Sequence, residues 1–278
     1  MLQNLIRRTP RPGDVSRLTT PELREAFLLE KLFVPGALQG CFTDLDRLVV
    51  GGVMPVDHGL ELANHKETGR SFFLEQREMG ILNIGGHGRI TADGQSFELE
   101  RLDCLYLPVG TREVSFFSRN PAEPSRFYFL SCPAHSRLPM ALLKSRDASP
   151  VALGSQTTSN KRVIYKLIHP GGIKSCQLVM GYTALEPGNV WNSFPPHTHC
   201  RRTEIYFYFD LQDGVVSHFM GEPQSTRHLF VHDQQGALSP NWSIHCGCGT
   251  SHYKFIWGMA GENQVFDDMD AIKPLDLQ

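Results

Sequence analysis

The sequence has few of the features that mark nucleic-acid-binding or membrane proteins. Its 27 Lys and Arg and 29 Asp and Glu are dispersed and leave a formal net charge of −2, without the clustered basic residues of a nucleic-acid interface. No apolar run approaches the roughly 20 residues that span a bilayer, and the N-terminus has no apolar signal-peptide region. We therefore expect neither a nucleic-acid nor a membrane partner.

A disulfide framework is also missing. The seven cysteines are odd in number and spread along the chain, which is not the pattern of a small disulfide-stabilised protein. The simplest location is a reducing cytoplasm. At 278 residues, the chain can bury a large core as one big domain or two modest ones.

Helical periodicity is scarce as well. One clear helix is expected within residues 19–33, with Thr20 as its cap, Pro21 at its first helical position and apolar residues at helical spacing. Pro35 and Gly36 end it. The N-terminal region therefore supplies a short helix to a protein that is otherwise expected to be β.

Short strands between turn residues make up most of the remaining chain. Asp93-Gly94 between two strand-like runs is a strong hairpin signal. Residues 134–160, rich in Ser, Pro, Ala and Thr, resemble a connector, and a second strand series begins at Arg162. The pattern predicts a mainly β fold of two tandem β-sandwich or barrel halves, residues 1–150 and 151–278.

The residues with metal-ligand spacing lie in the second half. His197 and His199 are two apart, so on a strand both imidazoles share one face and can reach one ion. Cys200 points the other way on that strand, which argues against it as a ligand. Glu204 has the wrong parity for the same straight strand, so a turn or bulge is expected before it.

The strand that begins at Glu204 predicts a polar face. Glu204, Tyr206 and Tyr208 alternate with apolar residues, so a carboxylate and two phenols share one side. His245 follows about forty residues later between Pro and Gly residues and is the expected fourth ligand. Three imidazoles and a carboxylate suit zinc, our first choice, but also manganese, iron, cobalt or nickel. The alternative is that these residues belong to an exposed hairpin.

This arrangement resembles the cupin superfamily and, within it, the 5-keto-4-deoxyuronate isomerase family. The similarity spans nearly the whole chain and is carried by residues 197–209, 222–228, 239–245 and 255–270, with Asp46-Arg47, Gly51-Gly52 and 107–111 in the first half.

The resemblance implies a ketol-isomerase of pectin degradation, an intramolecular oxidoreductase with one Zn²⁺ per chain. It would convert 5-dehydro-4-deoxy-D-glucuronate to 3-deoxy-D-glycero-2,5-hexodiulosonate as a homohexamer of cupin-like chains, with a metal-free N-terminal half. His197, His199, Glu204 and His245 carry over as the metal ligands.

Other roles rest on the expected chemistry. The uronate substrate is an anion, and Arg202 and Arg227 are candidates to bind its carboxylate, although a surface salt bridge is an equally good account of each. Tyr206 and Lys254 are candidates for proton transfer, and Glu204 could alternate between ligand and base.

Two alternative functions remain open at this point. An iron-dependent cupin dioxygenase would use the same ligand set but would need a redox-active metal and O₂. A sugar-binding cupin without catalytic activity is the alternative outside the enzymes, and the presence of all four ligands argues against it.

Overall fold

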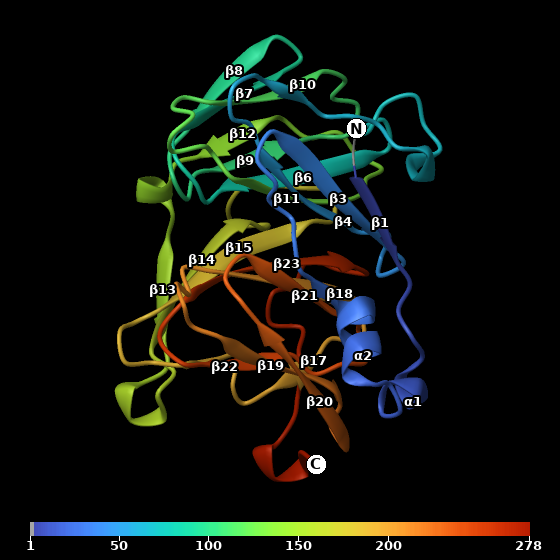
Figure 1. Cartoon of the computed structure of the whole chain (residues 1–278), viewed down its shortest axis with the longest axis vertical. Coiled ribbons are helices and arrows are strands. Elements are labelled where there is room, and N and C mark those ends of the chain that lie inside the picture. Colours follow the sequence, from blue (N-terminus) through green and yellow to red (C-terminus); the bar gives the residue numbers. More distant parts are fainter. Residues whose placement is uncertain (1–2) are drawn as a thin grey trace. The chain divides into compact units, whose positions relative to one another are not determined.

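The computed structural model describes residues 3–278 as two compact units, each mainly β (Figure 1). The first unit holds Lys31–Ala148, Leu167–Val179 and the N-terminal residues through Ile6. The second holds Arg7–Glu30, Ser149–Lys166 and Met180–Gln278. The prediction of a mainly β protein with two sandwich halves is confirmed, whereas a boundary between residues 150 and 151 stays a prediction.

The first unit packs a seven-stranded sheet against a four-stranded one. The strand order of the larger sheet is β1 (Gln3–Arg7), β3 (Ala37–Thr43), β4 (Val49–Met54), β11 (Phe127–Pro133), β6 (Arg77–Asn83), β9 (Cys104–Leu107) and β12 (Ala141–Leu143). The smaller sheet has the order β5 (Leu60–Glu61), β10 (Val114–Ser118), β7 (Gly88–Ala92) and β8 (Gln95–Leu99).

The second unit repeats this plan. Its seven-stranded sheet has the order β13 (Pro150–Leu153), β14 (Arg162–Ile168), β15 (Val179–Leu185), β23 (Lys254–Gly261), β18 (Arg202–Phe209), β21 (Gln235–Ser239) and β2 (Leu28–Leu29). Its four-stranded sheet has the order β16 (Trp191–Asn192), β22 (Cys246–Gly249), β19 (Val216–Glu222) and β20 (Ser225–Val231), and β17 (His197–Thr198) pairs with β24 (Asp270–Ala271).

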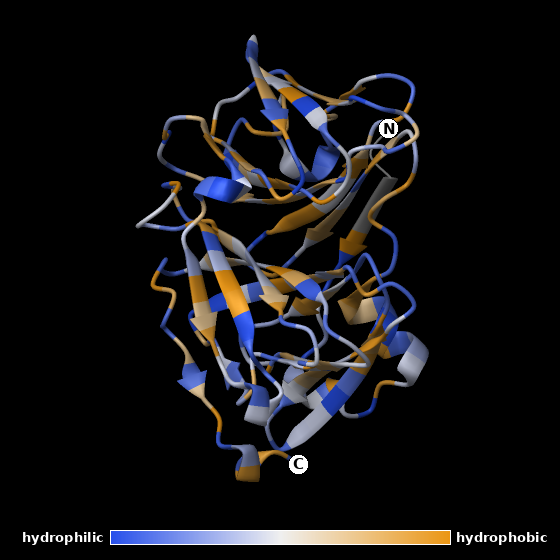
Figure 2. Ribbon diagram, turned by 90° about the vertical axis from the view of Figure 1, so that its left-hand side faces the viewer, coloured by the Kyte–Doolittle hydropathy of each residue, from blue (hydrophilic) through white to orange (hydrophobic). Residues whose placement is uncertain are grey.

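The two units share one strand connectivity. In the larger sheets, β3-β4-β11-β6-β9 corresponds to β14-β15-β23-β18-β21, and in the smaller ones β5-β10-β7-β8 corresponds to β16-β22-β19-β20. Bands of hydrophobic and hydrophilic residues alternate along the strands, as expected when one face of each sheet is buried (Figure 2). The tandem repeat therefore lies in topology, although the two sequences differ.

Local turn chemistry explains the β7–β8 hairpin. Ala92 pairs with Gln95, and Asp93 and Gly94 between them both have positive φ, at 45° and 79°. A two-residue turn with this backbone matches the twist of the strands and favours Asp-Gly. The predicted hairpin is confirmed.

The helical segments lie near the N-terminus, at α1 (Pro12–Val15) and α2 (Thr20–Phe27), and four short 3₁₀ turns lie at Lys66–Thr68, Ser145–Asp147, Gln156–Thr158 and Pro274–Asp276. The predicted cap of α2 is wrong by one residue, because Thr19 donates from its amide and hydroxyl to the Glu22 carboxylate at 2.8 and 2.6 Å. The helix also ends at Phe27, since Leu28–Leu29 joins a sheet as β2. Within the described residues, no helix has the length and apolar character needed to cross a membrane.

Apolar side chains fill the interior of the first unit. Met79 and Ile81 of β6 are fully buried in a cluster that includes Ile90, Phe116 and Phe127 of neighbouring strands. In the second unit, β18 corresponds to β6 and carries Glu204 and Tyr206 instead. This strand thus contributes apolar side chains to the core of the first unit, whereas the corresponding strand of the second unit contributes polar side chains to a cavity.

A buried carboxylate lies at one side of the first unit. Glu78 is inaccessible to solvent and accepts hydrogen bonds from the backbone amides of Cys176, Gln177 and Leu178 at 2.7–2.8 Å. The Tyr106 hydroxyl donates to it at 2.6 Å. A carboxylate has about four acceptor sites, and these four donors occupy them. Glu78 therefore joins residues 176–178 to the sheet.

Candidate metal centre

A strand, a turn and a second strand carry three of the expected ligands. β17 contains His197 and ends at Thr198, Cys200 and Arg201 form the turn, and β18 begins at Arg202. The turn restores the parity that places Glu204 on the same side as the histidines, as predicted. Cys200 is exposed and lies outside the ligand group.

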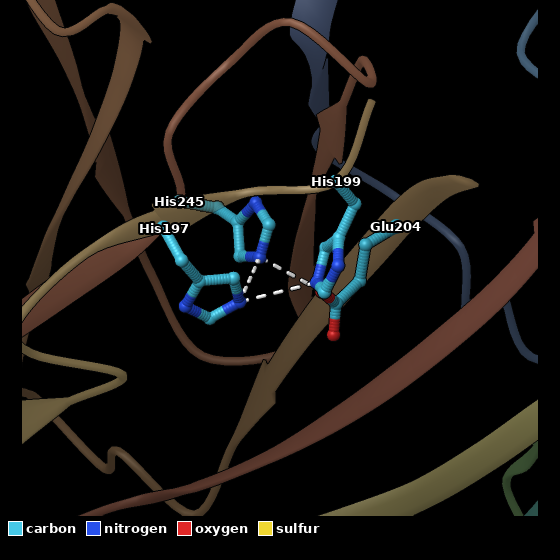
Figure 3. A group of neighbouring side chains, drawn as sticks. All are labelled: His197, His199, Glu204 and His245. Carbon is cyan, nitrogen blue, oxygen red and sulfur yellow. Dashed lines mark hydrogen bonds and ion pairs between the residues drawn. The ribbon is translucent and has the colours of Figure 1, made fainter. Parts of the chain in front are cut away.

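Three imidazoles and one carboxylate converge at a single point (Figure 3). The Nε2 atom of His197 lies 3.1 Å from the Nε2 atoms of both His199 and His245. Glu204 Oε2 lies 3.2 Å from His199 Nε2 and 2.8 Å from His245 Nε2. These four residues form a group that could hold a metal ion, and it is the one such group among residues 3–278.

The spacing of the ligand atoms tests how an ion would fit. An ion ~2.1 Å from each ligand holds two ligands roughly 3.0 Å apart at a right angle and roughly 3.4 Å apart at the tetrahedral angle. The four separations of 2.8–3.2 Å are closer to the right-angle value. In each of these four pairs, both atoms are therefore close enough together to bind one ion.

Hydrogen bonds behind the ligands fix which ring nitrogen faces the centre. His199 Nδ1 lies 2.9 Å from the Asp268 carbonyl oxygen, which can only accept, so Nδ1 carries the proton. His245 Nδ1 lies 2.9 Å from Ser239 Oγ. A proton on Nδ1 leaves the Nε2 lone pair free for a metal, which is the usual arrangement around histidine ligands.

Burial and charge keep the ligands in their metal-binding states. Burial, helped by the neighbouring His245, lowers the pKa of His197 to about 2. Burial would raise the pKa of Glu204, but its contacts with the imidazoles of His245 and His199 outweigh burial and hold the pKa below its usual value. The imidazole of His197 is therefore neutral and Glu204 ionised at neutral pH, as metal ligation requires.

The ligands open into a cavity of about 230 Å³ in the second unit. Glu204 and Tyr206 line it from β18, whereas Tyr208, the third residue of the predicted polar face, is buried outside the lining. The Tyr206 hydroxyl lies 2.7 Å from Ser193 Oγ. Aromatic walls come from Phe255 and Trp257 of β23 and from Phe194 and Phe266. The lining also includes Arg162 and Ile164 of β14, Thr183 of β15, and Leu153, Pro195, Met259 and Met269.

Comparison with known proteins shows the family of this chain. A family model described as the KduI/IolB family matches residues 47–273. The chain belongs to this family. The KduI/IolB chain is 50% identical over 268 residues to the 4-deoxy-L-threo-5-hexosulose-uronate ketol-isomerase of Halalkalibacterium halodurans, covering 96% of this chain and 97% of the relative. It is also 50% identical to the protein of the same name from Opitutus terrae, over 97% of this chain and 98% of the relative.

Solved structures show the same fold at low sequence identity. An IolB-like protein from Salmonella typhimurium superposes with a TM-score of 0.67 at 15% identity, over 81% of this chain and 86% of that one. Oxalate decarboxylase from Bacillus subtilis gives 0.55 at 12% identity, over 78% and 69%. These likenesses confirm the expected cupin-like architecture of the KduI/IolB chain.

The predicted substrate residue Arg202 is buried behind His199. Its Nη2 donates to the Asp268 carbonyl at 2.9 Å, and a 3.2 Å contact with His199 Nδ1 is not a hydrogen bond if that nitrogen is protonated. Next to it, Arg201 pairs with Asp268 and Asp270. Both arginines thus hold residues 268–270 against the ligand strand, and a direct role of Arg202 toward substrate stays a prediction.

Lys254 and Arg227 lie outside the cavity lining that the described residues form. Lys254 alternates with Phe255 on β23, so it points to the opposite face, where its ammonium pairs with Asp210 at 2.7 Å. Arg227 donates to the carbonyl oxygens of Val15 and Leu18 at 2.7 and 2.9 Å. It therefore holds the end of α1 and the residues that follow it. The proposed roles of Lys254 and Arg227 in the reaction stay predictions.

Several residues of the centre escaped the sequence analysis. Arg162 lines the cavity from the start of a strand, and Asp268 and Ser239 orient ligands through a backbone carbonyl and a hydroxyl. Alternation on β14 would place Arg162 and Ile164 on one face, but only the sheet order shows that this face lies toward Glu204. The carbonyl of Asp268 leaves no sequence signal at all.

A buried histidine near the centre predicts how stability depends on pH. His218 is fully buried, and its Nδ1 lies 2.7 Å from the Tyr208 hydroxyl, a donor because burial raises the pKa of Tyr208. Burial lowers the pKa of His218 to about 3. Its neutral form therefore contributes stability above the unfolded pKa of about 6.5, and this contribution is lost as pH falls toward 3.

We expect the metal-free protein to lose up to about 1.4 kcal/mol of unfolding free energy per pH unit from this one group below pH 6.5. Urea unfolding at several pH values from 7 to 4 measures it. The His218→Gln variant should show a shallower pH dependence by that amount, even if it is less stable throughout. Parallel curves for wild type and variant would contradict the prediction.

Proposed function

We propose that the chain is a metal-dependent ketol-isomerase that converts 5-dehydro-4-deoxy-D-glucuronate to 3-deoxy-D-glycero-2,5-hexodiulosonate in uronate and pectin degradation. The observation that carries this proposal is the convergence of three imidazoles and a carboxylate beside a cavity in a member of this family. Relatives that are 50% identical over nearly their whole length carry the name of this activity.

The proposed metal is Zn²⁺, one per chain, held by His197, His199, Glu204 and His245. Three nitrogen ligands and one oxygen ligand suit zinc, although manganese, iron and cobalt accept similar sets. The ion would keep coordination positions open toward the cavity, which His197, His199 and Glu204 line. That side is where a substrate would enter.

The reaction moves hydrogen between an aldehyde carbon and the hydroxyl-bearing carbon beside it. A divalent ion at this centre supplies a Lewis acid that polarises the substrate carbonyl. Glu204 uses Oε2 toward the imidazoles, and its second oxygen points away from them (Figure 3). We propose that this second oxygen accepts the proton of the hydroxyl-bearing carbon and then returns it to the former aldehyde carbon, so that Glu204 ends the cycle ionised as it began.

Tyr206 is placed to help from the same strand face. Burial raises the pKa of its phenol well above the usual value, so the hydroxyl keeps its proton and can donate a hydrogen bond. In the proposed mechanism it exchanges its partner Ser193 for a substrate oxygen. The aromatic side chains of Phe255, Trp257 and Phe266 exclude water from the cavity. They would thereby protect the substrate while it lacks the transferred proton.

A homohexamer and a cytoplasmic location accompany this function as proposals. Light scattering of the purified protein should give a mass six times that of one chain, and a smaller mass would remove the hexamer from the proposal without affecting the activity.

The test of the function is turnover of the uronate before and after removal of the metal. Dialysis against a chelator is expected to lower the rate at least ~100-fold, because carbonyl polarisation is lost, and Zn²⁺ should restore it. The same assay without O₂ should give an unchanged rate, whereas an iron-dependent dioxygenase would stop. Full activity in protein shown to be free of metal would disprove the mechanism.

A further inference from the structure

One permanently charged cationic side chain lines the cavity. Of the residues that line it, Arg162 is the single Arg or Lys, and it lies half-buried at the first position of β14. Ile164 points into the cavity from the same strand face, and Leu153 of β13 is the cross-strand neighbour of Arg162. An arginine in these apolar surroundings needs a reason to be there, because burying its charge costs free energy.

The guanidinium is held in place but has no acidic partner. Arg162 Nη1 donates to the Asn160 carbonyl at 2.8 Å, and this is its one hydrogen bond among the described residues. No carboxylate of residues 3–278 forms an ion pair with it, and burial is the main cause that lowers its pKa. Its remaining N–H groups are therefore available to an anion that enters the cavity.

Asn160 connects Arg162 to Phe194, another residue of the cavity lining. Its side-chain oxygen accepts from the Ser155 amide and the Thr158 hydroxyl, at 3.0 and 2.6 Å. Its side-chain nitrogen donates to the Phe194 carbonyl at 3.4 Å, and Phe194 lines the cavity. The backbone that positions Arg162 is thus fixed by a network rather than left as a loose loop end.

Sheet order places this arginine at a distance from the ligands. β14 and β18 are separated by β15 and β23, so their axes are three strand spacings apart, about 14 Å along the sheet. The arginine side chain covers part of this span from one side and the ligand side chains cover part from the other. Because Arg162 and the ligands His197, His199 and Glu204 line the same cavity, one short molecule can contact both at once.

We propose that Arg162 binds the carboxylate of the substrate, so that the 2-oxo acid end lies at β14 and the aldehyde end at the four ligands. This inference rests on the proposed function, and it deepens it by fixing the orientation of the substrate. It also names a specificity determinant, because a neutral sugar of the same length would leave the guanidinium unpaired. The planar fork of arginine matches a carboxylate through two parallel hydrogen bonds.

The test compares the uronate with its methyl ester, which has the same shape without the charge. In the metal-loaded wild type, the acid should be preferred over the ester about 10- to 100-fold in kcat/KM. Arg162→Gln should raise KM for the acid by a similar factor, with kcat within about 3-fold, and should leave the ester unaffected. Arg162→Lys should restore part of the preference, since one charged donor replaces a fork.

Lys161→Gln is the matched control. Lys161 is the adjacent residue, carries the same charge and pairs with Glu186 at 2.8 Å outside the cavity lining. This variant should keep the KM of the wild type for both compounds. Metal content and circular dichroism of each variant establish that the centre and the fold are intact.

The outcomes separate the two proposals. A wild type that turns over neither compound with metal bound would refute the function itself. A wild type that converts the acid but does not prefer it over the ester, or an Arg162→Gln variant with unchanged KM or equal losses for both compounds, would overturn the role of Arg162 alone. If Arg162→Gln does not fold, the acid-to-ester preference of the wild type and of Arg162→Lys decides the question.

Discussion

The His199→Ala variant is expected to lose its bound metal and more than ~10³-fold of its kcat/KM while keeping its fold. His199 is 3% exposed and supplies one of four converging ligand atoms, so its loss leaves an incomplete set. A factor of 10³ corresponds to about 4 kcal/mol of transition-state stabilisation, within the several kcal/mol that a Lewis acid contributes. Metal analysis, steady-state kinetics and circular dichroism measure the three properties.

His252→Ala is the matched control for this variant. His252 is exposed and lies outside the ligand group, so the same substitution there should change neither metal content nor rate. A His199→Ala protein that retains stoichiometric metal and wild-type kinetics would contradict the centre described above. A protein that loses metal but keeps its rate would leave the ligand assignment intact and refute metal-dependent catalysis.

Glu78→Gln is expected to have the second largest effect, on stability rather than on catalysis. The carboxylate accepts from three backbone amides and the Tyr106 hydroxyl in a fully buried position. An amide in its place directs its own N–H groups at these donors and leaves some of them unpaired. We expect a loss of about 3–5 kcal/mol in the unfolding free energy of the first unit, as when one partner of a buried charged network is removed.

Chemical denaturation followed by far-ultraviolet circular dichroism measures this loss. All three tryptophans, Trp191, Trp242 and Trp257, lie in the second unit, so their fluorescence reports that unit separately. Glu113→Gln removes an exposed carboxylate of the same unit and should cost less than about 0.5 kcal/mol. Equal stability of the two variants would show that the Glu78 network contributes little.

Local spacing was enough to predict that His197, His199 and Glu204 lie together, whereas His245 followed from its flanking residues and from the family resemblance. His197 and His199 share a strand face by parity, and Glu204 returns to that face through the turn at Cys200 and Arg201. The hairpin at Asp93-Gly94 was predictable for a similar reason, since its backbone requirement is local. Such features depend on residues that are neighbours in sequence, where geometry follows from backbone rules.

Features that depend on sheet order were not predictable. Arg162 reaches the cavity only because β14, β15, β23 and β18 lie in that order. Arg202 and Arg227 were predicted to bind the substrate carboxylate because of their charge. In the structure, Arg202 instead donates to the carbonyl oxygen of Asp268. Arg227 donates to those of Val15 and Leu18. Charge predicts that an arginine needs acceptors, and it does not predict which acceptors the fold provides.

The two cupin-like halves illustrate the same limit. Their strand order is shared, but Met79 and Ile81 belong to a packed core in the first, whereas Glu204 and Tyr206 line a cavity in the second. Because the two sequences differ at these positions, sequence comparison within the chain gave only weak support for a duplication. The shared strand order therefore shows the similarity of the two halves, although the residues of their interiors differ.

The N-terminal segment has a consequence for synthesis of the protein. Residues 7–30 belong to the second unit, where β2 pairs with β21 through Leu28 with Ala237 and Leu29 with Gly236. A ribosome makes this segment before Lys31–Ala148 of the first unit, and its partner strand emerges more than 200 residues later. The segment therefore cannot pair with β21 until that part of the first unit has been made. A fragment that starts at residue 149 would therefore lack β2, an edge strand of the sheet that carries Glu204. The second unit is thus not encoded by one continuous segment of the chain.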